Sequence, residues 1–185
     1  MDRLLDRACT GPLFLRMPGV AKMVMDAIYY RDQRTYHLHA FVVMPNHVHL
    51  LMTRLEAVSK VMESPKRFTA REGNRLLGLT GQPFWQDESW DRLVRNDTEF
   101  ERIVYYIERN PVTAGLAATP EEFPWSSARP IDNRPQLAKT LTHPATCSCN
   151  LLLQSTKLAS GMMTKSWYEV PSSSASALCR RPRSR

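Results

Sequence analysis

The sequence lacks any apolar run close to the roughly 18 residues that a membrane-spanning helix needs. Its first 17 residues carry Asp2 and Asp6 among arginines and contain no sustained apolar stretch, so they do not resemble a secretory signal. We therefore expect a cytoplasmic chain with no membrane partner. In that compartment its four cysteines are expected to be reduced rather than bridged.

Acidic residues are scarce in one part of the chain only. The length of 185 residues suits one domain, or one domain plus a tail, and a hydrophobic content of 43% is enough for a packed core. The formal net charge of +7 suggests an anionic partner such as nucleic acid. Residues 1–134, however, hold 18 Lys+Arg and 17 Asp+Glu, whereas residues 135–185 hold 7 and 1. Net charge is therefore a weak argument for a basic domain.

Apolar periodicity predicts a helix followed by a β-hairpin near the start of the chain. Pro18 to Gln33 has helical spacing, with Pro18 in the first turn. Two runs rich in aromatic and β-branched residues, Tyr36 to Val43 and His47 to Met52, predict strands. Residues 44–46 between them are typical of a turn because proline and asparagine favour turn geometry.

A second helix and an extended segment are predicted after the hairpin. Ser64 as the cap and Pro65 at the first helical position indicate a helix that runs to about Leu77. Phe84 to Val94 predicts a strand or another extended segment.

The helix from Asn96 to Asn110 has the strongest pattern. Asn96 with Glu99 three residues later is a capping-box variant. Pro111 is expected to end the helix at about Asn110 because proline has no backbone N–H. The predicted buried stripe consists of Phe100, Ile103, Val104 and Ile107.

Residues 135–185 differ in composition from the rest of the chain. They are rich in serine and basic residues and have few regular patterns, so we expect a mostly disordered basic tail. Cys147, Cys149 and His143 offer three potential metal ligands there. Their spacing matches no common zinc site, so we expect no metal at that place.

Two histidines form the first candidate site. His47 and His49 are two residues apart on a predicted strand, so their side chains face the same side and are able to hold one divalent metal. The alternative, which this spacing alone favours, is a pair of partly buried structural histidines. His37 and His39 on the neighbouring strand are expected to be structural because the turn places them far from His47.

Tyr106 and Asn110 form the second candidate site. They are four residues apart on the predicted helix and share one flank of its apolar stripe, whereas Tyr105 points nearly the opposite way. Tyr106 is either an aromatic residue at the edge of the core or a nucleophile beside a metal ligand. Helical spacing alone favours the first reading.

Both candidate sites lie within motifs that resemble one family. MPNHVHLL (residues 44–51) matches a motif of HUH single-tyrosine transposases, and YIERNPVTAGL (residues 106–116) looks like their second motif. FWQDES (residues 84–89) and FPWSSA (residues 123–128) also resemble the REP-associated tyrosine transposases of that group. The resemblance extends from about residue 18 to residue 128, and four motifs in order argue strongly against a chance match.

The resemblance implies an α+β, ferredoxin-like HUH domain, with an antiparallel sheet and packed helices, over residues 18–134 after an unmatched segment 1–17. Family members usually begin with a strand that precedes the first helix and lies centrally in the sheet. Residues 1–17 contain no similar run. We therefore expect a domain without the usual first strand, with sheet edges exposed as a consequence.

The resemblance also implies the roles of single residues. In the family, two histidines and a polar residue four positions after the tyrosine hold Mg²⁺ or Mn²⁺, and the matching positions here are His47, His49 and Asn110. Tyr106 matches the nucleophile that attacks single-stranded DNA and forms a 5′-phosphotyrosine. This implies a transposase or endonuclease that cuts and joins strands at hairpin-flanked sites, as a monomer or homodimer associated with the nucleoid.

Local charge suggests where DNA phosphates bind. Residues 54–75 carry a net charge of +3. The candidate DNA-binding residues are Lys60, Lys66, Arg67, Arg71 and Arg75. A solvated helix face explains any one of them equally well. Trp85 and Trp90 are expected either to stack on unpaired bases or to belong to the core.

Two rival functions stay open. The first is a truncated, non-catalytic protein of the same fold that binds hairpin DNA. The second is a hydrolytic metallophosphoesterase that uses His47 and His49 without a covalent step. No acidic ligand follows the two histidines as many such hydrolases require, which argues against the second rival.

Overall fold

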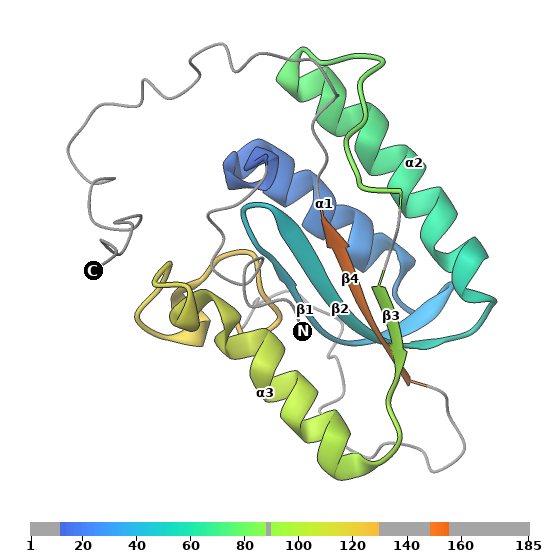
Figure 1. Ribbon diagram of the computed structural model, residues 1–185, viewed down its shortest axis with the longest axis vertical. Coiled ribbons are helices and arrows are strands. Elements are labelled where there is room, and N and C mark those ends of the chain that lie inside the picture. The colour runs from blue at the N-terminus through green and yellow to red at the C-terminus, as the bar shows by residue number, and fades with distance from the viewer. Residues whose placement is uncertain (1–11, 88–89, 130–148, 156–185) are drawn as a thin grey trace, which may run out of the picture.

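The computed structural model describes residues 12–87, 90–129 and 149–155. Over these residues the chain forms an antiparallel sheet with helices packed on both faces (Figure 1). The predicted α+β class is therefore confirmed. No helix in the described ranges is long and apolar enough to span a membrane.

The sheet contains four strands in the order β1-β2-β4-β3. β1 (Tyr36–Val43) pairs with β2 (His47–Arg54), which pairs on its other side with β4 (Cys149–Ser155). β3 (Trp90–Leu93) pairs with the outer side of β4. Every neighbouring pair is antiparallel, so a strand from near the end of the chain lies inside the sheet.

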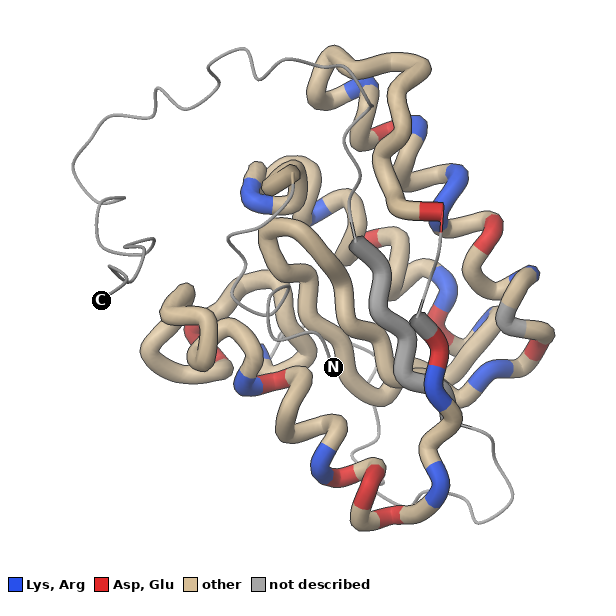
Figure 2. The backbone as a smooth tube through the Cα atoms, in the orientation of Figure 1, with Lys and Arg blue, Asp and Glu red and all other residues tan. Residues whose placement is uncertain are grey.

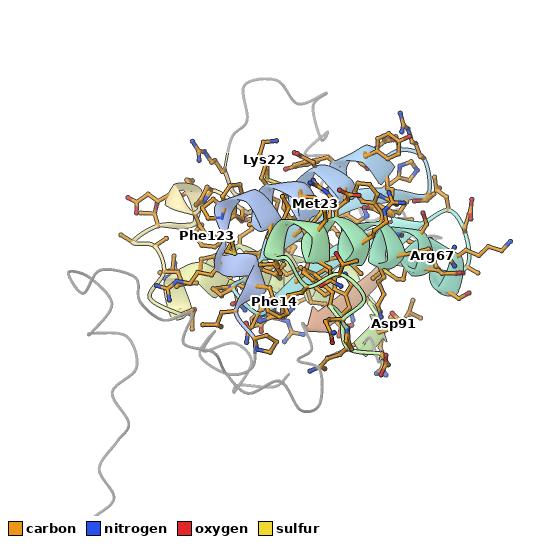
Figure 3. All side chains as sticks on the ribbon, turned by 90° about the horizontal axis from the view of Figure 1, so that it is seen from above. Phe14, Lys22, Met23, Arg67, Asp91 and Phe123 are labelled. Atoms are coloured by element: carbon orange, nitrogen blue, oxygen red, sulfur yellow. The ribbon has the colours of Figure 1, made fainter. Side chains whose placement is uncertain are left out.

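The helices divide between the two faces of the sheet. α1 (Pro18–Arg31) and α2 (Val58–Leu77) lie side by side on one face, as Figures 1 and 3 show. α3 (Asp97–Thr113) packs against β1 and β2 on the other face. Two short 3₁₀ turns, η1 (Phe14–Arg16) and η2 (Pro120–Glu122), accompany α1 and α3 respectively.

Alternation along β2 assigns its side chains to two cores. Val48 and Leu50 belong to the apolar cluster under α1 and α2. Leu51 belongs to the cluster under α3. Because successive side chains of a strand point to opposite faces, His47 and His49 share the face of Leu51 and are directed toward α3.

The first helix and the hairpin are confirmed. α1 begins at Pro18 as predicted and ends at Arg31, two residues before the predicted end. β1 has the predicted bounds, and β2 begins at His47 and continues two residues beyond the predicted end, to Arg54. The Met44 N–H donates to the His47 carbonyl at 2.8 Å and closes the turn between the strands.

Two helix boundaries were predicted wrongly because proline was interpreted as a boundary signal. α2 begins at Val58 rather than at Ser64, and Pro65 lies inside the helix. α3 continues through Pro111 to Thr113 instead of ending at about Asn110. An internal proline removes one backbone donor, and packing of the surrounding turns compensates for that loss here. The carbonyl of Pro65 also accepts a hydrogen bond from the Thr69 hydroxyl at 2.6 Å.

The predicted disordered tail is wrong for seven of its residues. Residues 149–155 form β4 in the interior of the sheet. Their three consecutive leucines are a short apolar run of the kind found in inner strands, but the serine-rich and basic surroundings hid it. Residues 135–148 and 156–185 lie outside the described part of the chain, and so do residues 143 and 147 of the candidate Cys/His metal site. β3 lies within the segment predicted as extended.

The N-terminus of α3 is fixed by two hydrogen bonds that involve Glu99. The Asn96 side-chain oxygen accepts from the Glu99 N–H at 2.9 Å, as the capping box predicts. The Glu99 carboxylate accepts from the Arg95 N–H at 2.9 Å and contacts the Arg92 guanidinium. The hydrogen bond from Arg95, followed by the nearby arginine charges, lowers the pKa of Glu99.

Glu99→Gln is expected to lower the free energy of unfolding by about 1 kcal/mol at pH 7, the usual size of a lost helix-cap interaction. A carboxylate with a lowered pKa stabilises the fold above its unfolded pKa, and the effect is lost as the pH falls through the folded value. Urea unfolding should therefore show the penalty shrinking as the pH falls below the ordinary glutamate pKa of about 4.3.

Glu101→Gln is the matched control for this prediction because Glu101 is exposed on the same helix. It should change stability by less than about 0.5 kcal/mol. A Glu99→Gln penalty that stays constant over the acidic range would contradict the assignment of a charged cap.

Gly73 of α2 lies against Phe84, which leaves no room for a side chain. A Cβ at residue 73 would lie 2.5 Å from Phe84 Cε2 and 2.8 Å from Cζ. Phe84 is itself buried and stacks on Phe14 with ring centroids 5.7 Å apart, so its ring has little freedom to move.

Gly73→Ala is expected to lower the free energy of unfolding by about 1–3 kcal/mol, the usual cost of overpacking. Gly19→Ala in α1 is the control because nothing described lies within 4 Å of a Cβ built there. That variant should be neutral or more stable by up to about 1 kcal/mol, since alanine favours helices over glycine. Equal effects of the two substitutions in chemical denaturation would contradict this account.

Candidate functional site

His47 and His49 form a buried pair on the face of β2 that is directed toward α3. Their side chains are 0% and 1% exposed. The two Nε2 atoms are 3.1 Å apart, and the rings meet edge to face with centroids at 4.7 Å. Two nitrogens bound at right angles to one metal would lie about 3 Å apart, given bond lengths near 2.1 Å. The pair therefore has a separation suited to holding one ion.

Asn46 orients the first histidine. Its side-chain oxygen lies 2.7 Å from His47 Nδ1. Because an amide oxygen only accepts hydrogen bonds, Nδ1 carries the hydrogen and Nε2 of the neutral ring keeps its lone pair. Metal-binding histidines commonly have this second contact, which fixes the ring and its tautomer. The sequence had indicated Asn46 only as a turn residue, and its position directly before His47 was the available signal.

α3 brings two more polar side chains to the histidine pair. The Tyr106 ring lies edge to face with the His49 ring, with centroids 5.4 Å apart. Asn110, one helical turn later, is 3% exposed, and its Nδ2 lies 3.4 Å from His49 Nε2. The structure therefore brings together the four candidate residues from β2 and α3.

The Asn110 amide is the group that best tests whether these residues fit a metal ion. Its Oδ1 is buried and receives no hydrogen bond within the described part of the chain. In a neutral pair, His49 Nε2 donates its hydrogen to the lone pair of His47 Nε2. Asn110 Nδ2 is also a donor and lies beside the same His49 nitrogen, so two donors face each other. Turning the amide by 180° exchanges the places of its oxygen and nitrogen. Oδ1 would then join the two imidazole nitrogens.

A ligand set of two imidazole nitrogens and one amide oxygen suits a divalent cation. Imidazole and carbonyl ligands together suit ions between the hard and borderline classes, Mn²⁺ among them. Among the described residues no group of three or more His, Cys, Asp and Glu side chains is placed to hold a metal. A cation at this site would thus keep its full charge, because all three protein ligands are neutral.

The predicted DNA-binding residues lie elsewhere. They are all on α2, which carries several basic and acidic residues along its length (Figure 2). α2 packs on the opposite face of the sheet from α3. Lys66 Nζ donates to the carbonyls of Gln86 and Asp87 at 3.2 and 3.3 Å, and burial lowers the pKa of Lys66. The structure therefore does not bring this group to the histidine pair.

The remaining basic residues of α2 are exposed. Arg67 pairs with Glu63, while Arg71 and Arg75 both contact Glu72. Exposed ion pairs between arginine and glutamate contribute little stability. These arginines are therefore able to leave the glutamate and bind a DNA phosphate instead. Lys60 is exposed as well. Their DNA contact stays a prediction.

Other candidates from the sequence have structural surroundings. His39 Nε2 lies 2.7 Å from Thr53 Oγ1, and His37 Nδ1 lies 3.0 Å from Gln33 Oε1, both away from His47. Trp85 is buried in the core under α1 and α2, and its indole N–H donates to Thr69 at 2.8 Å.

Mn²⁺ is expected to raise the melting temperature of the chain, because an ion that binds only the folded state stabilises it. At 100 times the Kd this stabilisation is about 2.7 kcal/mol. Asn110→Leu should lose most of the Mn²⁺-dependent shift without a large loss of metal-free stability, since it removes a buried oxygen that accepts no described hydrogen bond. Differential scanning fluorimetry with and without Mn²⁺ measures both quantities.

Asn74→Leu is the control for this prediction, since Asn74 is a buried asparagine on α2 that donates to the Gln82 carbonyl. It should lower metal-free stability and leave the Mn²⁺ shift intact. A Mn²⁺ shift that survives Asn110→Leu unchanged would remove Asn110 from the ligand set.

Comparison with known proteins supports the resemblance seen in the motifs. The chain is 29% identical over 104 residues to a REP-associated tyrosine transposase of Escherichia coli (strain K12). The alignment covers 54% of this chain and 59% of the relative, so the chain matches about three fifths of that protein's length. The predicted similarity to REP-associated tyrosine transposases is confirmed.

Two further comparisons complete the description. A solved structure of a REP-associated tyrosine transposase bound to a REP hairpin has a TM-score of 0.46 and 23% sequence identity to this chain. That match covers 62% of this chain and 67% of the other. No family model matches the sequence.

Proposed function

We propose that the chain cleaves and joins single-stranded DNA in a reaction that depends on a divalent metal, with Tyr106 as the nucleophile. The observation that carries the proposal is the meeting of Tyr106 and Asn110 with the buried histidine pair. Similarity to a curated tyrosine transposase supports the same chemistry. Hairpin-flanked sites are the proposed targets, in keeping with the motifs shared with that group.

The Tyr106 oxygen attacks a phosphodiester phosphorus and forms a new P–O bond. The Tyr106 hydroxyl gives up its proton as it attacks, the bond from phosphorus to the 3′-oxygen breaks, and that oxygen takes up a proton and leaves as a 3′-hydroxyl. The product is a 5′-phosphotyrosine. Since the covalent link conserves the phosphodiester energy, attack by a 3′-hydroxyl reverses the step and joins strands without ATP.

The groups around Tyr106 suit this task. An ordinary tyrosine has a pKa near 10, so its oxygen needs alignment and charge stabilisation in order to react at neutral pH. His47, His49 and Asn110 would hold a Mg²⁺ or Mn²⁺ ion, which supplies polarisation of the scissile phosphate when bound. The Asn46 contact orients the His47 ring for that purpose. The Tyr106 hydroxyl is buried, so binding of DNA must open the structure around it.

The neutral ligand set favours an anionic substrate. Because no carboxylate is among the proposed ligands, the positive charge of the ion would not be neutralised by the protein and would attract the phosphate oxygens of the DNA. A hydrolase of the same site would activate water instead and would not need Tyr106. The position of Tyr106 beside His49 therefore favours the covalent reaction over the hydrolytic one.

Incubation of the chain with a hairpin oligonucleotide and Mn²⁺ is expected to give a protein–DNA adduct that survives denaturing electrophoresis. A 3′-terminal label follows the fragment that carries the 5′-phosphotyrosine, and a 5′-terminal label follows the released fragment. Tyr106→Phe should abolish the adduct because it removes the attacking oxygen. Chelation of the metal should lower adduct formation strongly in the native chain.

Tyr105→Phe is the matched control, since Tyr105 is 63% exposed and lies under the Arg109 guanidinium, away from the histidine pair. It should keep the adduct. An adduct that persists in Tyr106→Phe would overturn the assignment of the nucleophile. Turnover without an adduct would indicate hydrolysis, and hairpin binding without cleavage would indicate a non-catalytic binding protein.

A further inference from the structure

The sheet contains a place for one strand between β2 and β3. Both of these strands are antiparallel to β4, so they run parallel to each other and are separated by one strand width. The chain between them forms α2 on one face of the sheet. This is a split β-α-β arrangement, which presents two facing strand edges to whatever occupies the space between them. We refer to this space as the slot.

The slot borders the candidate metal site directly. β2 pairs with β1 along one edge, and its other edge forms one side of the slot. In the slot, His47 lies opposite Ser155 and His49 lies opposite Leu153. The N–H and C=O groups of a buried strand need partners on both sides, so the histidine-bearing backbone depends on an occupant.

We propose that the slot is a strand-acceptor site for an extended apolar peptide, and that its occupation by residues 149–155, which form β4 there, holds the histidine pair in its ligand geometry. Main-chain hydrogen bonds to an exposed strand edge are a general mode of peptide recognition. The strand-acceptor part stands independently of the DNA chemistry, whereas its effect on metal binding rests on the proposed function.

The sequence of residues 149–155 suits this place. It contains neither proline nor glycine, both of which weaken inner strands. Its ladder runs unbroken from Thr53 opposite Cys149 to His47 opposite Ser155 on the β2 side. On the β3 side, residues 150–153 pair as well. The occupant is thus paired on both edges over the stretch next to His49.

A disulfide test measures occupation and register directly. Thr53→Cys, in a full-length chain whose Cys9, Cys147 and Cys179 are serine, should form a disulfide with Cys149 under mild oxidation. Opposed residues of an antiparallel pair have Cα atoms about 4.5–5.5 Å apart, within the range that disulfides bridge. Arg54→Cys in the same background is the control, because the β4 ladder ends at Thr53. Peptide mass spectrometry identifies the linked pair.

Formation of an intramolecular 53–149 link, well above the yield of the 54–149 link, is the expected result. Equal yields of the two links, or links only between separate chains, would overturn the proposal that the chain's own segment fills the slot in this register. The readout needs neither DNA nor metal. A chain that forms the link but makes no Tyr106 adduct would therefore refute the proposed function alone.

The coupling to the metal site is tested by Leu152→Pro in the full chain. Every N–H of an inner strand faces one neighbour or the other, so proline at residue 152 interrupts the ladder. Mn²⁺ affinity should fall about tenfold or more, as it does when outer-shell support of a metal site is lost. A synthetic peptide of residues 147–157, added in excess, should restore the Mn²⁺-dependent melting shift.

Ser173→Pro is the control outside β4 and should keep the Mn²⁺ affinity of the native chain. If Leu152→Pro also keeps that affinity and the native melting temperature, occupation of the slot does not hold the histidines and the proposal fails. If Leu152→Pro does not fold, rescue of folding by the added peptide supports the proposal, and absence of rescue contradicts it.

Discussion

The contact between β2 and α3 underlies the candidate site, because neither element carries all of its groups. β2 supplies the two imidazoles, α3 supplies Tyr106 and Asn110, and the two elements meet where Asn110 Nδ2 approaches His49 Nε2 at 3.4 Å. The surrounding fold preserves this contact. The ladders to β1 and β4 hold β2 from both sides, and the apolar stripe of α3 packs on the same face. A slip of β2 by one residue would turn both histidines to the opposite face.

Polar atoms inside a protein are costly unless they are paired, and the site concentrates several of them. A buried acceptor without a hydrogen bond costs about 1–3 kcal/mol, so Asn110 Oδ1 destabilises the metal-free fold as long as Nδ2, and not the oxygen, faces His49. A bound cation would satisfy this oxygen and the two Nε2 atoms at once. None of the three proposed ligands is a carboxylate that could neutralise the ion, which links the choice of ligands to an anionic substrate. Structure, stability and proposed chemistry thus depend on one small group of atoms.

Much of the fold could be predicted from local patterns, and the exceptions have physical causes. The hairpin and α1 followed from spacing, because periodicity reports which face of an element is buried. The boundaries of α2 and α3 were predicted wrongly because Pro65 and Pro111 lie inside these helices. Tertiary packing there outweighs the one hydrogen bond that each proline removes. β4 was missed because the serine-rich and basic composition around it hid its short apolar run. The four site residues came from motifs, since helical and strand spacing cannot show that β2 and α3 meet. Local sequence patterns also could not predict on which face of the sheet α2 packs.

The central claim is that His47, His49 and Asn110 bind one divalent cation beside Tyr106. Anomalous diffraction from crystals grown with Mn²⁺ tests it most directly, because the anomalous signal locates the ion without assumptions about its ligands. The account predicts a peak within bonding distance of both Nε2 atoms, with the Asn110 oxygen turned toward it. A peak at another place, or no peak while the two imidazoles stay hydrogen bonded to each other, would contradict the account.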